Sequence, residues 1–184
     1  IDYQDAINQL NDCQTVVFVG GISSQLEGEE MPIHVPGFKG GDRTDIELPA
    51  VQRNFLKALK AAGKKVVFVN CSGSAIALTP ESQSCDAILQ AWYAGEQGGH
   101  AIADVLFGDY NPSGKLSITF YKDDTQLPAF DEYSMANRTY RYFKGEALFP
   151  FGYGLSYTTF AIGQPTYKNN KVRVEVKNTG EREG

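Results

Sequence analysis

The stretch Val66-Val67-Phe68-Val69, followed by the loop Cys71-Ser72-Gly73-Ser74, decides the fold. A run of β-branched and aromatic residues that ends in a Gly/Ser loop is typical of a strand buried on both faces of a sheet. Before it, apolar positions in residues 49–62 recur on one helical face, and Gly63 suits the end of that helix. A similar apolar run at residues 16–19 precedes the helix. Strand, helix and strand in this order predict a parallel sheet covered by helices.

The same alternation continues on both sides of this unit. Residues 87–92 are expected to form a third strand, and a Gly-rich turn separates them from a helix at residues 100–107. At the amino end, residues 3–11 carry apolar side chains at helical spacing. We therefore expect an α/β fold, a three-layer α/β/α sandwich with a mostly parallel sheet.

The pattern changes in the last third of the chain. After a turn signal at residues 111–114, residues 116–120 alternate like an edge strand. Between Val172 and Val176, valines alternate with charged residues, which predicts a half-exposed strand. We expect the first strands of a β-sandwich here, truncated at the end of the chain. The predicted domains are residues 1–157 and 158–184.

The composition is that of an ordinary globular protein. With 184 residues, 42% of them hydrophobic, the chain is long enough for one substantial domain and part of another. A net charge of -5 argues against a nucleic-acid partner, and no apolar run of about 18 residues is present to span a membrane. Cys13, Cys71 and Cys85 lack the CxxC spacing of metal or redox sites, so we expect them in or near the core and expect no cofactor. Ile1 opens the chain without a leader, so we expect a piece of a longer protein.

Four motifs carry a family resemblance: Glu27-Gly28-Glu29-Glu30, Gly41-Asp42-Arg43, residues 91–99 and residues 149–157. Together they resemble the carboxyl-terminal α/β domain of family 3 glycoside hydrolases, the β-glucosidases and β-xylosidases. The resemblance covers nearly the whole chain. It implies a fibronectin type III-like domain at the end, and a separate (β/α) barrel domain that carries a nucleophilic aspartate. It also favours a periplasmic or secreted location.

Glu27 is the candidate acid/base residue. A glycosidase needs two carboxyl groups, one of which protonates the leaving oxygen. The resemblance implies that this group comes from a loop of the present domain, and Glu27 matches it by motif. Glu29 and Glu30 remain alternatives, because the family varies most here. We expect Glu27 on a mobile, exposed loop at the carboxyl end of the sheet, where α/β proteins bind ligands.

Asp42 and Arg43 lie between this loop and the predicted helix at residues 49–62. A bidentate pair between the two side chains would pin the loop, and we favour this structural role over contact with a sugar. Eleven residues, 31–41, separate Glu30 from Asp42, which is longer than the commoner spacing in the family.

Other functions fit less well or stay open. After Gly20-Gly21 no third glycine completes the GxGxxG fingerprint of nucleotide-binding domains, and no GxSxG elbow of a serine hydrolase is present. Trp92 and Tyr93 could stack on a sugar, although a lone Trp that ends a strand is more often core. A non-catalytic interaction module remains the alternative, because the aromatic and Gly residues after Tyr133 suit a surface packed against another domain.

We therefore expect the acid/base-bearing domain of a retaining, exo-acting β-glycosidase, which hydrolyses terminal non-reducing β-linked sugars. Its partners would be an oligosaccharide or β-glycoside substrate and the amino-terminal barrel of the same protein, without nucleic acid or membrane. The chain alone is expected to be inactive, because it lacks the nucleophile. The form Leu26-Glu27-Gly28-Glu29-Glu30-Met31 favours a β-xylosidase over a β-glucosidase.

Overall fold

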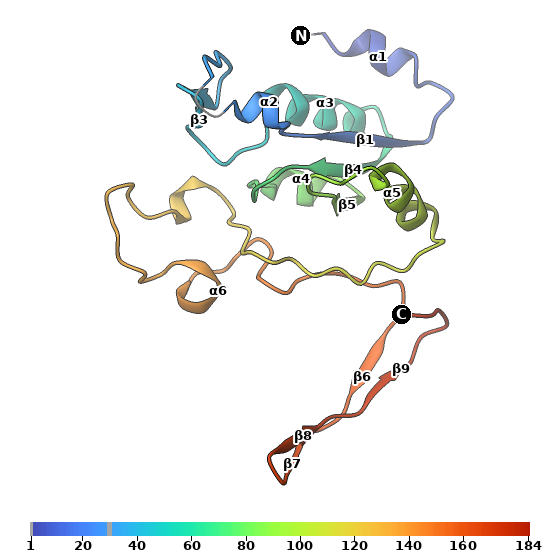
Figure 1. Cartoon of the computed structure of the whole chain (residues 1–184). Helices are drawn as coiled ribbons and strands as arrows, with labels where there is room; N and C mark the ends of the chain where they lie inside the picture. The colour runs from blue at the N-terminus through green and yellow to red at the C-terminus, as the bar shows by residue number, and fades with distance from the viewer. Residues whose placement is uncertain (1, 29–30) are drawn as a thin grey trace. The chain divides into compact units, whose positions relative to one another are not determined.

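The main sheet contains three parallel strands within residues 2–28 and 31–184, the part of the chain that the computed structural model describes. Their order is β1, β4, β5 (Figure 1). Their bounds are Thr15–Gly21 for β1, Lys65–Cys71 for β4 and Ala87–Gln90 for β5. β1 pairs with β4 along its whole length, and β5 pairs with the second half of β4. The prediction of an α/β fold with a parallel sheet is confirmed.

The central strand β4 is buried as predicted, whereas the edge strand β1 is not. The fully buried hydrophobic side chains of β4 are those of Val66, Phe68 and Val69. In β1, Val17 and Val19 are 48% and 62% exposed, so the expectation of a buried run is wrong for one face of this strand. Successive side chains of a strand point to opposite faces, and the face of β1 that carries Phe18 packs against Phe55 of the neighbouring helix.

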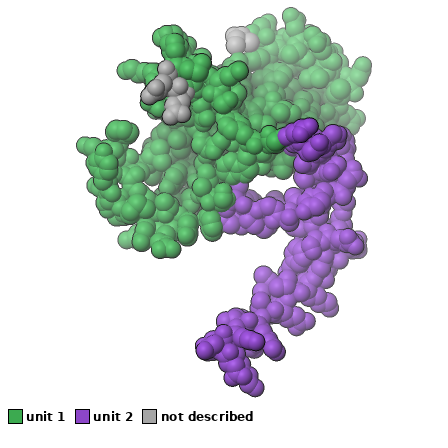
Figure 2. All heavy atoms as spheres, viewed as in Figure 1, with its two compact units in different colours: residues 1–95, 117–151 green, residues 96–116, 152–184 purple. Residues whose placement is uncertain are grey.

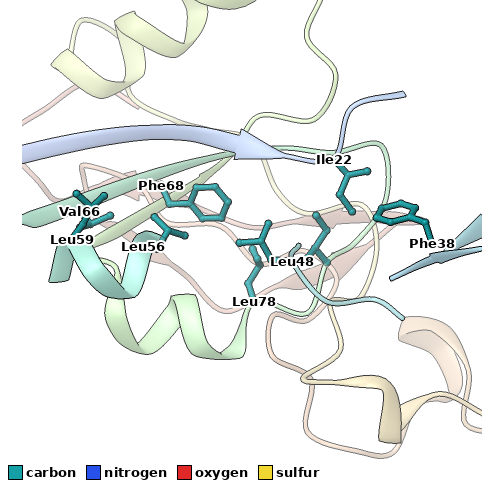
Figure 3. Packing of buried hydrophobic residues seen from close by; sticks show 9 residues of the cluster. Ile22, Phe38, Leu48, Leu56, Leu59, Val66, Phe68 and Leu78 are labelled. Carbon is teal, nitrogen blue, oxygen red and sulfur yellow. The ribbon is translucent and has the colours of Figure 1, made fainter. Parts of the chain in front are cut away.

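Two helices, α3 (Ala50–Ala61) and α4 (Thr79–Ser84), pack against each other, and α3 contacts β1 and β4. The helix predicted at residues 49–62 is thereby confirmed. Gly63, with φ +76°, follows the end of α3, where a left-handed residue commonly stops a helix. The core lies between α3, β4 and the segments that follow the strands (Figure 3). It comprises Ile22, Phe38, Leu48, Leu56, Leu59, Val66, Phe68, Ile76 and Leu78.

Short elements complete this part of the chain. They are α1 (Gln4–Asn8), α2 (Ser24–Glu27), β2 (Phe38–Lys39), β3 (Asp42–Arg43), the 3-10 helix η1 (Asp124–Gln126) and α6 (Thr139–Tyr142). The strand expected at residues 116–120 is absent from the described structure; only Phe120 forms a bridge, to Phe149. Beyond this bridge the two segments are joined by irregular backbone hydrogen bonds, in which the N–H of Leu116 donates to the carbonyl of Tyr153 and the N–H of Gly152 donates to the carbonyl of Leu116.

The chain divides into two units (Figure 2), residues 1–95 with 117–151 and residues 96–116 with 152–184. The sheet belongs to the first unit. The second contains α5 (Gly98–Phe107), which Gly108 ends as predicted, and four strands. These are β6 (Phe160–Ile162), β7 (Thr166–Lys168), β8 (Lys171–Arg173) and β9 (Val176–Asn178). The proposed domain boundary after residue 157 stays a prediction.

The four strands of the second unit form two antiparallel two-stranded sheets, in which β6 pairs with β9 and β7 with β8. Asn169 and Asn170, with φ of 51° and 56°, form the two-residue turn between β7 and β8, as a type I′ hairpin requires. All side chains of these strands are exposed.

No helix in the described residues is long and apolar enough to cross a membrane. The cysteines are free thiols. Cys71 and Cys85 are partly buried, but Cys13 is exposed, so the expected core position is wrong for Cys13.

Candidate active site

The site lies at the carboxyl edge of the sheet, where the chain leaves the three parallel strands. The segment after β1 leads into α2, the loop after β4 carries Ser74, and the segment after β5 carries Tyr93. Because the carboxyl ends of parallel strands meet at one edge, these three segments converge there. Figure 1 shows α2 and β3 together beyond the end of β1.

Glu27 is placed by the short helix α2, of which it is the last residue. Ser23 caps the amino end, where its side-chain oxygen accepts a hydrogen bond from the backbone N–H of Leu26. Gly28 ends the helix in the left-handed conformation, with φ +56°. Glu27 is half-buried. The prediction of a mobile, exposed loop is therefore wrong for Glu27, because a capped helical turn and neighbouring side chains hold it. Glu29 and Glu30 lie outside the described residues.

Two hydroxyl groups contact the carboxylate of Glu27, one on each oxygen. The Tyr93 hydroxyl lies 3.3 Å from Oε2, and Ser74 Oγ lies 3.5 Å from Oε1, at the limit of a hydrogen bond. The Tyr93 hydroxyl also donates to the backbone carbonyl of Ile22 at 2.5 Å. Burial and the charge of Glu27 raise the pKa of Tyr93 above its ordinary value, which keeps it a neutral phenol.

Arg43 joins the site through Ser74. The β2–β3 hairpin turns at Gly40 and Gly41, both with positive φ, and this turn brings Arg43 to the loop after β4. Arg43 Nη1 donates to Ser74 Oγ at 3.0 Å, which leaves the Ser74 proton free to point at Glu27. The buried Nη2 of Arg43 has no hydrogen-bond partner among the described residues.

The expected pair between Asp42 and Arg43 is not among the ion pairs of the described structure. Adjacent strand residues point to opposite faces, which keeps the two side chains apart. Burial lowers the pKa of Arg43. The nearby carboxylates of Asp45, Glu27 and Asp124 oppose this change.

The side-chain neighbours of Glu27 are compatible with a carboxylate and with a carboxylic acid. Within residues 2–28 and 31–184, Glu27 takes part in no ion pair, and its described hydrogen-bond neighbours are hydroxyl groups. A hydroxyl can donate to a carboxylate or accept from a carboxylic acid, so these neighbours tolerate either protonation state. The described residues contain no cluster of three or more His, Cys, Asp or Glu side chains placed to hold a metal ion.

Sequence reasoning placed Glu27 at this edge but missed its neighbours. Ser74 was noted only as part of a Gly/Ser loop, and Tyr93 as part of an aromatic pair. The signal that could have found them is their position after β4 and β5, since loops at the carboxyl ends of neighbouring strands meet. Trp92, by contrast, is partly buried and packs edge-on against Phe120, which agrees with its expected core role.

Comparisons with known proteins agree with one another. The family model described as "Glycosyl hydrolase family 3 C-terminal domain" matches residues 2–157. A xylan 1,4-beta-xylosidase of Xylanibacter ruminicola is 64% identical over 190 residues, which cover 100% of this chain and 22% of that protein. A periplasmic beta-glucosidase of Salmonella typhimurium is 42% identical, covering 98% of this chain and 25% of that protein.

The fold comparison gives the same result. The structure of beta-glucosidase 3B from Thermotoga neapolitana in complex with glycerol superimposes with a TM-score of 0.80 and 28% identity. The match covers 100% of this chain and 28% of that one. The chain thus spans about a quarter of the length of these relatives.

Proposed function

Since the chain belongs to the family 3 glycosyl hydrolases, as their carboxyl-terminal domain, we propose that it supplies the acid/base residue of a retaining, exo-acting β-glycosidase. The residue is Glu27. The observation that carries the proposal is its position: Glu27 is half-buried at the carboxyl edge of the parallel sheet, between two hydroxyl groups and without an ion-pair partner in the described structure.

The nucleophile comes from outside this chain in our proposal. The family resemblance implies a nucleophilic aspartate in a (β/α) barrel domain. The relatives are about four times as long as the matched segment, which leaves room for such a domain. We call this chain joined to such a barrel the intact enzyme. It can be assembled by placing the chain in the X. ruminicola xylosidase, in place of the segment that it matches.

The mechanism needs two steps from Glu27. In the first, the aspartate of the barrel attacks the anomeric carbon while Glu27 donates its proton to the departing oxygen. In the second, the Glu27 carboxylate takes a proton from water, which releases the sugar from the aspartate with retained configuration. The two carboxyl groups should stand about 5 Å apart in the intact enzyme, as double displacement requires.

We propose terminal, non-reducing β-linked xylose as the first substrate class, with β-glucosides next. The 64% identical relative is a xylan 1,4-beta-xylosidase, whereas the periplasmic beta-glucosidase is 42% identical. The sequence of residues 26–31 also favours β-xylosides over β-glucosides as substrates.

A non-catalytic interaction module is the second candidate. Its support is the apolar surface of residues 127–142, where Phe130 is fully exposed and Tyr133 is 89% exposed. Such aromatic side chains are typical of surfaces that another domain covers. This role requires no titratable group at Glu27.

The leaving-group dependence of the intact enzyme separates the two. We expect Glu27→Gln to lower kcat/KM for xylobiose at least 100-fold and that for 2,4-dinitrophenyl β-xyloside far less, because the dinitrophenolate leaves without a proton. Glu146→Gln, the same change at an exposed carboxylate, is the matched control. Equal losses for both substrates would exclude Glu27, and the same pair of measurements on Glu29→Gln and Glu30→Gln would then test the alternatives.

A further inference from the structure

The hydroxyl of Tyr93 occupies an unusual place between two acceptors. It lies 2.5 Å from the carbonyl oxygen of Ile22 and 3.3 Å from Oε2 of Glu27. Ile22 follows β1, Glu27 ends α2, and Tyr93 follows β5, so one phenol connects the segments that leave the two edge strands of the sheet. A phenol carries one proton and can also accept one hydrogen bond or more. Tyr93 can therefore donate to one neighbour at a time, and its oxygen can accept a hydrogen bond from Glu27 when Glu27 is a carboxylic acid.

The backbone around Tyr93 is shaped to hold its ring in this place. Trp92 has φ +56°, a left-handed conformation that is strained and rare for a bulky side chain. Gly73 lies against the ring: a Cβ added there would come 2.7 Å from Cε2 of Tyr93, closer than real Cβ contacts. Strain before the residue and a glycine beside its ring are independent features. Both are explained if the position of the phenol matters.

We propose that Tyr93 is a positioning residue for Glu27 that holds the carboxyl group in both of its protonation states. This inference rests on the proposed function. When Glu27 is a carboxylate, the phenol proton can turn to Oε2. When Glu27 is a carboxylic acid, its proton is donated to the phenol oxygen, and the phenol proton stays on the carbonyl of Ile22.

The chemistry explains why a hydroxyl suits this position better than a cation. An acid/base residue changes protonation state in each half of the reaction, and it must keep its place in both. A lysine or arginine at Tyr93 would favour the carboxylate and oppose its protonation. Arg43 lies near enough to Glu27 for their charges to attract, but no ion pair joins them in the described structure, and Arg43 donates a hydrogen bond to Ser74 instead.

The first test uses the intact enzyme with Tyr93→Phe, which removes only the hydroxyl. We expect kcat/KM for xylobiose to fall about tenfold and that for 2,4-dinitrophenyl β-xyloside to fall less than about twofold. Tyr3→Phe is the matched control, because the Tyr3 hydroxyl also donates to a backbone carbonyl, that of Val51, but does not contact Glu27. If the role of Tyr93 were merely structural, Tyr93→Phe would lower kcat/KM equally for both substrates.

The second test needs no turnover and no change at Tyr93. In the 184-residue chain, the carboxylate of Glu27 raises the pKa of Tyr93, so Glu27→Gln should lower that pKa toward its ordinary value. The ζ-carbon resonance of Tyr93, followed by NMR against pH, measures the change, with Glu146→Gln as control. An unchanged pKa would overturn the contact.

The two failures are distinguishable. If Tyr93→Phe changes kcat/KM no more than Tyr3→Phe does, and Glu27→Gln still shows its leaving-group dependence, only the role of Tyr93 is overturned. Equal losses for both substrates in Glu27→Gln overturn the proposed function, and with it this role.

Discussion

Arg53 of α3 and Glu81 of α4 form a two-point ion pair beside the core. Arg53 Nε donates to Oε1 of Glu81 at 2.7 Å, and Nη2 donates to Oε2 at 3.1 Å. Arg53 also reaches Glu47 at 2.5 Å and the carbonyl of Ala77 at 3.0 Å. Glu81 is 1% exposed. The Arg53 guanidinium therefore joins α3 to α4, to the segment after β3 that carries Glu47, and to the segment after Ser74 that carries Ala77.

Removing the charge of Glu81 should destabilise the chain strongly. Glu81→Gln removes one of the two carboxylates that pair with the partly buried guanidinium of Arg53 and leaves Glu47 as the other. Breaking a fully buried pair costs about 3–5 kcal/mol, so we expect a loss near the lower end of this range. Urea denaturation followed by circular dichroism measures the free energy of unfolding. Glu146→Gln, which breaks the exposed pair with Lys122, should leave this free energy unchanged because solvent screens that pair. A Glu81→Gln variant as stable as Glu146→Gln would contradict the structural role.

A methyl group at Gly21 should not be tolerated. Gly21 ends β1 with φ +124°, and an added Cβ would overlap the carbonyl oxygen of Cys71. We expect Gly21→Ala to cost about 2–4 kcal/mol, measured by thermal unfolding, because strain and a backbone clash act together. Gly95→Ala is the control, since open space surrounds that position. Equal melting temperatures for the two variants would show that the end of β1 is placed differently.

Asp86 should make stability depend on acid pH. Hydrogen bonds from Lys60 Nζ, at 2.9 Å, and from the backbone N–H of Val66, at 2.7 Å, lower the pKa of Asp86 below its ordinary value. A carboxyl whose pKa is lowered in the folded state binds more protons when unfolded. Its contribution is therefore complete above about pH 5 and is lost as the pH falls through the lowered pKa.

The measurement is the free energy of unfolding between pH 6 and pH 2. We expect the wild-type chain to lose more stability over this range than Asp86→Asn, which has no carboxyl to protonate at this position. Parallel curves for the two proteins would exclude Asp86 as a source of acid sensitivity.

The 184-residue chain should be inactive on aryl β-glycosides. One carboxyl group cannot supply both the nucleophile and the proton donor of a retaining mechanism. The assay is release of 4-nitrophenol from its β-xyloside and β-glucoside, with buffer as control. Turnover well above buffer that Glu27→Gln abolishes would contradict the division of the site between two domains.

Regular elements with strong local patterns were predictable. The apolar stripe of residues 49–62 and the run Val66-Val67-Phe68-Val69 appear as α3 and β4 because both are buried in the way their patterns indicate. The segment at residues 116–120 has an equally good alternating pattern but forms no strand. Whether such a segment forms a strand depends on the partner segment, and a local pattern does not include the partner.

The candidate site was predictable only in part. The family resemblance pointed to Glu27, and the position after β1 placed it at the carboxyl edge of the sheet. The contact with Tyr93 depends on the left-handed backbone of Trp92, a conformation that no rule of sequence assigns to tryptophan. The link from Arg43 to Ser74 depends on the β2–β3 hairpin, whose first strand and turn lie inside the longer spacing before Asp42.

Azide rescue of Glu27→Gln in the intact enzyme tests the central claim most directly. With 2,4-dinitrophenyl β-xyloside the first step needs no acid, so the variant should accumulate the glycosyl-enzyme, whose hydrolysis lacks its general base. Azide attacks without a general base. We predict that azide raises turnover at least about tenfold and that NMR identifies the product as the β-xylosyl azide. Unchanged turnover with azide, and xylose as the sole product, would show that Glu27 is not the acid/base residue.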